Sequence, residues 1–271
     1  MPTLKNHIIL YDAGCPMCNL YTRAFTTTGM LDPEGRAPYQ DMPKFACPLV
    51  DRERAINEIA LIDKTTGEVR YGIDSLFAVI GTSFPLFNPL FACKAFHRVM
   101  RKVYAFISYN RKVIIPAPKS DAHAIQPSFK LRYRIAYLLF TWAVIGSILT
   151  AYAKLLTPYI PAGNPWREYA ICGSQILFQG AVISGIAPAK CWDYLGNVMT
   201  ISLAGSLLLL PVLAIAAFTP IPALPGAAWF LLVVVLMLLE HIRRTKLLWL
   251  NNTVTFTWIA YRLAVLGLIL R

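Results

Sequence analysis

The sequence has little negative charge, and almost none in its second half. Its 271 residues include 14 acidic and 26 basic side chains, and only Glu168, Asp193 and Glu240 follow Asp121. A polar, proline-flanked stretch over residues 116–127 separates a mixed N-terminal half from an apolar C-terminal half. The formal charge of +12 would suit nucleic-acid binding. However, the basic residues gather beside long apolar runs, which favours a membrane and disfavours nucleic acid as the partner.

An apolar leader and a cysteine framework are also missing. Residues 1–5 run directly into a strand-like segment, without the apolar core and small-residue cleavage site of a secretory signal. We therefore expect the N-terminal half to stay in the cytoplasm. Six cysteines scattered over 271 residues do not form a disulfide scaffold. In a cytosolic domain, a CxxC motif indicates redox or metal chemistry instead.

Long uncharged apolar runs dominate the second half. A membrane-spanning helix needs about 20 mostly apolar residues. We expect helices over residues 135–152, 169–189, 196–218, 226–240 and 249–270. Helices of soluble proteins rarely lack a polar face over so many turns. The sequence therefore predicts an all-α, multi-pass transmembrane domain of about five helices in contact with a lipid bilayer.

The charges of the loops predict an orientation. With the N-terminus inside, the loop at 219–225 lies outside and carries no charge. The inner loops hold several basic residues, namely Lys190, His241, Arg243, Arg244 and Lys246. This distribution follows the positive-inside rule. We expect a multi-pass protein, of the kind found in a bacterial inner membrane, whose N-terminal domain is cytoplasmic.

Three polar side chains interrupt the apolar runs. Arg262 lies near the middle of the fifth run, where a charge is costly and faces protein, water or a partner, unless the side chain reaches an interface. Gln175 and Gln179 are four residues apart on one face of the second helix. They could bind a polar headgroup or a quinone, or form hydrogen bonds between helices, which is the commoner outcome.

The N-terminal half contains a Cys-Pro-Met-Cys motif that begins at Cys15. The motif follows an apolar, β-branched run at 7–12 and precedes a predicted helix at 19–28. A thiolate at a helix N-terminus is stabilised by free backbone amides and the helix dipole. We predict that Cys15 is an exposed nucleophile that attacks a disulfide, and that Cys18 resolves the mixed disulfide. Asp12 either accepts a proton from the resolving thiol or forms a turn or cap.

A hairpin and two helices are expected in the rest of this half. The predicted strands and turn cover residues 56–63, 68–71 and 64–67, and the helices cover 72–81 and 93–110. A sheet with helices on it agrees with a thioredoxin-like α/β fold.

Three short motifs follow one another in this half. They are Tyr11-Asp12-Ala13-Gly14 before Cys15, Tyr71-Gly72-Ile73-Asp74-Ser75-Leu76, and a Tyr-x5-Asn-Arg ending from Tyr104 to Arg111. Together they resemble the DCC (DUF393) family of thiol–disulfide oxidoreductases, over roughly residues 5–115. The resemblance implies a thioredoxin-like fold with a redox pair at Cys15 and Cys18.

Two features depart from that pattern. The family's usual Tyr-Asp-Gly opening is here Tyr-Asp-Ala-Gly. No proline directly precedes the strand expected at 56–63, where many thioredoxins carry a cis-proline beside the active site.

The expected substrate is a protein or small-molecule disulfide or thiol, and we expect no cofactor.

Two other functions remain open at this stage. Cys93 and His97 are four residues apart on a predicted helix and could complete a zinc site with Cys15 and Cys18, giving a zinc-stabilised domain without enzymatic activity. Alternatively, the chain is a membrane transport or lipid-handling protein whose soluble domain senses redox state.

The remaining cysteines are expected to be structural. Cys47 is interpreted as a small buried residue. Cys191 could be a relay thiol, but Cys172 is expected near the opposite membrane face, too far away to pair with it. We therefore predict an α/β thioredoxin-like soluble domain at 1–115, a linker at 116–132 and a transmembrane domain at 133–271. The chain would act as a membrane-anchored thiol–disulfide oxidoreductase whose redox partner the sequence does not identify.

Overall fold

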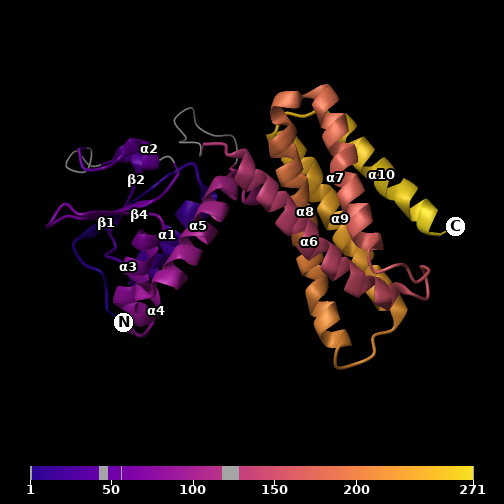
Figure 1. Ribbon diagram of the computed structural model, residues 1–271, viewed down its shortest axis with the longest axis horizontal. Helices are drawn as coiled ribbons and strands as arrows, with labels where there is room; N and C mark the ends of the chain where they lie inside the picture. Colours follow the sequence, from indigo (N-terminus) through magenta and orange to yellow (C-terminus); the bar gives the residue numbers. More distant parts are fainter. Residues whose placement is uncertain (1, 43–47, 56, 118–127, 271) are drawn as a thin grey trace. The chain divides into compact units, whose positions relative to one another are not determined.

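The computed structural model describes residues 2–42, 48–55, 57–117 and 128–270 (Figure 1). The chain forms two compact units, Met1–Tyr133 and Arg134–Arg271. The first unit combines a small sheet with helices, and the second is helical. Each unit is described by itself.

The first unit is built on a four-stranded mixed sheet in the order β2-β1-β3-β4. Its strands are β1 (His7–Tyr11), β2 (Arg36–Pro38), β3 (Ala60–Asp63) and β4 (Val69–Tyr71). β1 runs parallel to β2 and antiparallel to β3, and β3 and β4 form the predicted antiparallel hairpin. The two central strands are apolar on both faces because both faces of the sheet are covered.

Alternate residues of the central strands contribute to two separate cores. One core contains Ile9 and Leu61 together with both cysteines of the CxxC motif. The other contains Ile8, Leu10 and Ile62 with side chains from the segment between β2 and β3. The alternation follows from the strand geometry, in which successive side chains point to opposite faces.

Three longer helices and several short ones complete the first unit. The longer helices are α1 (Pro16–Thr27), α3 (Ile73–Ser83) and α5 (Lys94–Ile114). The short elements are η1 (Tyr39–Asp41), α2 (Arg52–Ala55), η2 (Pro85–Phe87) and α4 (Asn88–Ala92). The predicted helices at 19–28, 72–81 and 93–110 are therefore present, and the first begins earlier and the last ends later than expected.

The strand expected at 56–63 is wrong over residues 57–59, and residue 56 lies outside the described residues. Asp51 accepts backbone hydrogen bonds from Glu53 (2.9 Å) and Arg54 (3.2 Å), which starts the helical turn α2. The carbonyl of Arg54 then accepts the backbone N–H groups of both residues 57 and 58. Extended structure therefore begins only at Ala60. The short strand β2 was not expected, and Pro38 is tolerated there because β2 lies at the sheet edge.

The second unit contains the five apolar helices that the sequence predicts. They are α6 (Leu131–Ala153), α7 (Arg167–Ile186), α8 (Cys191–Ala216), α9 (Ala223–Leu247) and α10 (Thr253–Ile269), with single turns η3 (Lys154–Leu156) and η4 (Pro188–Lys190). Among the described residues, four helices are long and apolar enough to cross a membrane, and α10, with 17 residues, is shorter. α9 starts before the expected residue 226 because Pro225 is tolerated in the first turn.

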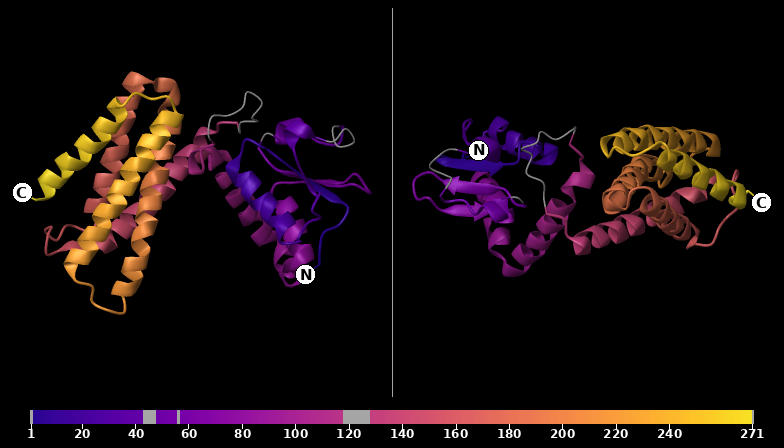
Figure 2. Two further views of the ribbon diagram at one scale, coloured as in Figure 1. Left: turned by 180° about the vertical axis from the view of Figure 1, so that it is seen from behind. Right: turned by 90° about the horizontal axis from the view of Figure 1, so that it is seen from above.

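The helices of the second unit lie side by side (Figure 2). They pack through small residues and expose large apolar ones. At Gly205 of α8, an added Cβ would lie 2.3 Å from the sulfur of Met237 on α9, so these two helices approach closely. In contrast, Leu177, Leu231 and Leu263 are each more than half exposed. Such an extensive apolar surface is compatible with contact to lipid.

Candidate functional site

The two cysteines of the CxxC motif lie at the start of α1. Cys15 is the N-cap residue, and its Sγ accepts the backbone N–H of Cys18 at 3.3 Å. Pro16 occupies the first helical position, where a backbone donor is not needed. Neither cysteine forms a disulfide in the part of the chain that the structure describes.

The predicted exposure of Cys15 is wrong. Cys15 is 6% exposed and Cys18 is 3% exposed. Both side chains pack in the same core as Ile9, Ile59 and Leu61, because the turn after β1 folds back over the sheet. The sulfur atoms therefore lie in an environment of low polarity, where a neighbouring charge has a strong effect.

A buried arginine supplies that charge. Nη1 of Arg111, near the end of α5, donates to the Sγ of Cys18 at 3.9 Å. Nη2 of the same side chain forms an ion pair with Oδ2 of Asp12 at 3.7 Å. The Arg111 and Asp12 side chains are each only 6% exposed. Residues far apart in the sequence therefore place one cation and one anion beside the two thiols.

Asp12 also forms the turn that precedes the motif. Its Oδ1 accepts the backbone N–H of Gly14 and the side-chain amide of Gln40, both at 3.0 Å. Its backbone carbonyl accepts the N–H of Cys15 at 3.0 Å. The turn-forming interpretation of Asp12 is confirmed. The role as proton acceptor for the resolving thiol stays a prediction.

The two thiols differ strongly in acidity. The hydrogen bond from the Cys18 thiol lowers the pKa of Cys15 to about 7, against the opposing effect of burial, and the Arg111 charge adds to the lowering. The same hydrogen bond, together with burial, raises the pKa of Cys18 well above its usual value. At pH 7, about half of the Cys15 thiol is therefore ionised, while Cys18 stays protonated.

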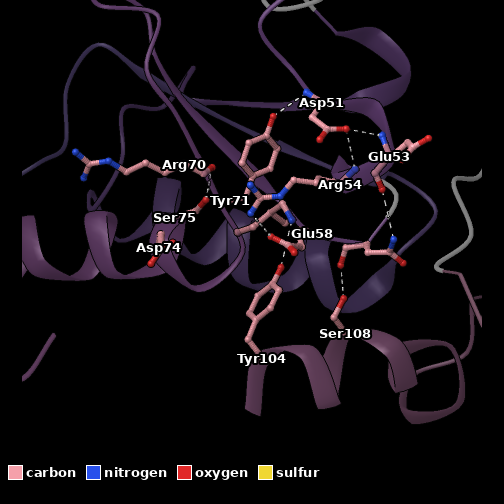
Figure 3. A network of polar contacts seen from close by, with 12 residues as sticks. Asp51, Glu53, Arg54, Glu58, Arg70, Tyr71, Asp74, Ser75, Tyr104 and Ser108 are labelled. Atoms are coloured by element: carbon pink, nitrogen blue, oxygen red, sulfur yellow. Dashed lines mark hydrogen bonds and ion pairs between the residues drawn. The ribbon is translucent and has the colours of Figure 1, made fainter. Parts of the chain in front are cut away.

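The other two sequence motifs contribute Tyr71 and Tyr104 to one polar network (Figure 3). The Tyr104 hydroxyl accepts the backbone N–H of Ile59 at 3.2 Å, and the Gly72 N–H donates to the Ile59 carbonyl at 2.9 Å. Gly72 has a φ of +59°, and an added Cβ would lie 2.9 Å from Oε2 of Glu58 and 3.1 Å from the Tyr104 ring. A side chain at this position would therefore be both strained and crowded. Ile59 itself packs in the same core as the two cysteines.

A polar network holds the segment before β3 against the hairpin (Figure 3). Arg54 forms an ion pair with Glu58 at 3.1 Å, and its guanidinium lies 4.1 Å from the centre of the Tyr71 ring. The Tyr71 hydroxyl accepts the backbone N–H of Asp51 at 2.7 Å. This network fixes the backbone around Ile59, which in turn supports the cysteine pair.

The last motif also ties α5 to the residues that follow it. Asn110 is fully buried, and its side-chain amide donates to the carbonyl oxygens of Phe106 at 2.9 Å and Tyr133 at 3.0 Å. The rings of Tyr109 and Tyr133 stack with a centroid distance of 4.6 Å. The adjacent Arg111 is thereby held in a well-packed part of the helix.

The residues proposed for zinc are not brought together. Nε2 of His97 pairs with Oδ1 of Asp74 at 2.5 Å, and Cys93 is exposed. Within the described ranges, no group of three or more His, Cys, Asp or Glu side chains could hold a metal ion. The alternative of a zinc site formed by Cys15, Cys18, Cys93 and His97 therefore gains no support from the described residues.

Three further cysteines were expected to be structural. Cys47 lies outside the described residues. Cys172 in α7 and Cys191 at the start of α8 are free thiols in the second unit, as the sequence predicts for helix residues. The Sγ of Cys191 accepts a hydrogen bond from Ser184 at 3.5 Å.

The sequence interpretation did not assign roles to Arg111 and Gln40. Arg111 ends the Tyr-x5-Asn-Arg motif, so the signal was present, but nothing in the spacing indicated that its side chain reaches the cysteines. Comparisons with family models, curated proteins and solved structures give no match to this chain. The geometry of the site is then the basis for assigning a function.

Proposed function

We propose that the first unit is a thioredoxin-like thiol–disulfide oxidoreductase that acts through Cys15 and Cys18. The order of elements supports this proposal. β1, α1 and β2 form a parallel βαβ unit, and β3, β4 and α3 form an antiparallel ββα unit beside it. This order of elements supports a thioredoxin-like fold, in which a CxxC motif stands at the turn between the first strand and the first helix.

One observation carries the proposal, namely the asymmetry between the two thiols beside Arg111. Cys15 accepts hydrogen bonds and has a pKa of about 7, whereas the pKa of Cys18 is raised. A cysteine that ionises near neutral pH is the better nucleophile. A neighbouring cysteine that stays protonated can act later, as the thiol that resolves the mixed disulfide. Structural cysteines in an apolar core have no such difference, because burial alone raises both pKa values.

The reaction follows in two displacements. The Cys15 thiolate attacks one sulfur of a substrate disulfide, forming a mixed disulfide and releasing the other substrate sulfur as a thiolate. Cys18 then loses its proton and attacks the Cys15 sulfur, which forms the Cys15–Cys18 disulfide and releases the second substrate thiolate. Both substrate thiolates are protonated by solvent. Two electrons pass from the cysteine pair to the substrate, and an external thiol reductant returns the pair to the dithiol form.

The substrate does not dock as it does in many thioredoxins. Those proteins present free backbone groups next to a cis-proline, and no cis peptide bond occurs in the described residues of this chain. At the corresponding place, the backbone N–H and C=O of Ile59 are both bonded, to Tyr104 and Gly72. We therefore expect side-chain contacts, rather than strand-like pairing at Ile59, to select the substrate.

The second unit anchors this chemistry at a membrane. Its four long apolar helices support a multi-pass arrangement. Basic residues concentrate at one end of these helices, where the η4 turn and the end of α9 carry Lys190, Arg243, Arg244 and Lys246. The positive-inside rule then puts the first unit in the cytoplasm, where a reductase is favoured over an oxidase. We propose a disulfide-containing protein or small molecule as the substrate.

A redox titration of the full-length protein in detergent tests the function. Free thiols are trapped with a mass tag at each potential, and Cys15 and Cys18 are followed by peptide mass spectrometry while zinc is assayed in parallel. We expect a reversible two-electron couple, lost in Cys15→Ser and unchanged in Cys93→Ser, which alters an exposed cysteine of the same unit. If the two cysteines never pair at any potential, or if stoichiometric zinc is bound, the proposal is wrong.

A further inference from the structure

Polar side chains lie between α7 and α10 at the level of the apolar runs. Gln175 and Gln179 of α7 are 8% and 0% exposed. They follow the start of the helix at Arg167 by eight and twelve residues, which corresponds to about 12 and 18 Å along its axis. If α7 spans a bilayer, as proposed above, both amides lie deep in the hydrocarbon region, where water is scarce.

The orientation of the Gln175 amide follows from its partner. Nη2 of Arg262, in α10, donates to Oε1 of Gln175 at 3.4 Å. An arginine can only donate, so the oxygen of Gln175 must face it and the amide nitrogen points elsewhere. Nε2 of Gln175 and Nε of Arg262 are both buried, and neither has a hydrogen-bond partner among the described residues. In the part of the chain that the structure describes, no carboxylate forms an ion pair with Arg262.

A chain of hydrogen bonds orients Gln179 in the same way. The Thr255 hydroxyl can donate to Nδ1 of His241 at 3.3 Å, and Nε2–H of His241 can donate to the Tyr194 hydroxyl at 3.2 Å. Tyr194 then donates its single hydroxyl hydrogen to Oε1 of Gln179 at 2.9 Å. The amide nitrogen of Gln179 is also buried, and it has no hydrogen-bond partner among the described residues.

All three unpartnered groups are donors, from two facing helices. A group that satisfies them must offer acceptor oxygens, as a carbonyl, a carboxylate or a phosphate does. Trp258 lies in the same interface, since it is 2% exposed and its ring centre lies 3.9 Å from the Arg262 guanidinium and 5.1 Å from the His241 ring centre. Buried donors beside an aromatic ring are typical of a site for a small ligand.

We propose that the α7–α10 interface binds the carbonyl group of a lipid-soluble ring, of the quinone class. The depth of the donors favours this ligand over a phospholipid headgroup, because phosphates stay at the surface of a hydrocarbon layer about 30 Å thick. A quinone ring moves within that layer. The inference rests on the proposed membrane placement of the second unit, and it is independent of the chemistry of Cys15 and Cys18.

The test uses the full-length protein in nanodiscs of neutral lipid. Decylubiquinone is titrated while tryptophan fluorescence is recorded, and an azido-quinone is used to map the labelled peptides. We expect saturable quenching and labelling confined to α7 and α10. Gln175→Leu removes one donor and should weaken binding by roughly 10-fold. Gln175→Glu places a carboxylate beside Arg262, so the bundle stays intact while quinone binding is lost.

Thr141→Val is the matched control. Thr141 is fully buried in α6, and its hydroxyl donates only to the carbonyl oxygens of Tyr137 and Leu138 in its own helix. This variant should bind decylubiquinone like the native protein. Thermal unfolding of each variant in nanodiscs checks that the bundle is intact.

Three results would overturn the proposal. The first is an absence of saturable quenching by the native protein, and the second is equal binding by the native protein and Gln175→Glu. The third is retention of phosphatidylglycerol instead of quinone in native mass spectra, with loss of that lipid in Gln175→Glu, since the occupant would then be a headgroup. A protein that does not insert into nanodiscs would refute the membrane placement itself, and an inactive cysteine pair would leave all of these results unchanged.

Discussion

Replacing Arg111 with glutamine tests the electrostatic argument at the cysteine pair. The Arg111 guanidinium stabilises the Cys15 thiolate, while the hydrogen bond from Cys18 is the larger contribution and burial opposes both. Glutamine keeps part of the volume and the hydrogen-bonding ability but removes the charge. A nearby opposite charge typically changes a pKa by about one to three units. Because Arg111 contributes less than the hydrogen bond from Cys18, we expect the pKa of Cys15 to rise by about one unit in Arg111→Gln.

The size of the effect on reactivity is smaller than the change in pKa suggests. At pH 7, a thiol with a pKa of about 7 is half ionised. A rise of about one pH unit lowers the thiolate fraction about fivefold, but the more basic thiolate is about threefold more nucleophilic. The net loss of rate at pH 7 is therefore only about twofold. The midpoint of the pH–rate profile is the more sensitive measurement.

The assay is alkylation of Cys15 by iodoacetamide between pH 5 and pH 10, with the labelled peptide quantified by mass spectrometry. Arg98→Gln is the matched control, because Arg98 is exposed on the same helix. The native protein and the control should share a midpoint near pH 7. An unchanged or lowered midpoint in a folded Arg111→Gln protein would refute the role of Arg111.

A second variant separates charge from stability. Removing Arg111 leaves the Asp12 carboxylate buried without its cationic partner, which typically costs about 3–5 kcal/mol. Adding Asp12→Asn removes that unpaired charge and should recover most of the loss in thermal stability. Asp12→Asn alone should lower the pKa of Cys15, because the Asp12 charge opposes thiolate formation. A rise of the alkylation midpoint in Asp12→Asn would contradict this sign.

Two further predictions concern the resolving thiol and the glycine beside the site. Cys18→Ser should accumulate a mixed disulfide at Cys15 with a model disulfide, seen as an added mass on that peptide, and a Cys15→Ser protein should form none. Gly72→Ala should lower the free energy of unfolding of the first unit by about 1–3 kcal/mol, because φ is +59° and the new Cβ would lie 2.9 Å from Glu58 and 3.1 Å from Tyr104. Denaturant titration measures this loss, and a variant as stable as the native protein would show that the contact relaxes without cost.

The cysteine motif and its helix show which structural features the local sequence pattern predicts correctly. An apolar run, a turn and Cys-Pro-x-Cys before a helical segment predicted β1 and α1 in the right places, since strand and helix periods are local properties. The expected strand began too early, because the side chain of Asp51 accepts hydrogen bonds from two backbone amides and favours a helical turn. A competition of that kind, between a side-chain cap and an apolar run, is not visible in hydropathy.

The environment of the two thiols, in contrast, could not be predicted from the local sequence. Arg111 is 93 positions from Cys18, and its side chain reaches the sulfur only because the tertiary fold brings the end of α5 beside the start of α1. The sequence motif that contains Arg111 is recognisable, but its spacing does not indicate that the Arg111 side chain contacts the cysteine pair. The burial of Cys15 was missed for the same reason, since a residue after a turn is expected at the surface until the rest of the chain covers it.

By itself, the sequence determined that the chain has an α/β half with a CxxC motif at a helix start and an apolar half with helices long enough to span a bilayer. These properties depend on residue order over a few turns. The tertiary structure alone decided that Arg111 and Asp12 flank the thiols, that Cys93 and His97 do not join them, and that Gln175, Gln179 and Arg262 face one interface. Long-range packing sets those distances, and distance determines how strongly charges and hydrogen bonds act.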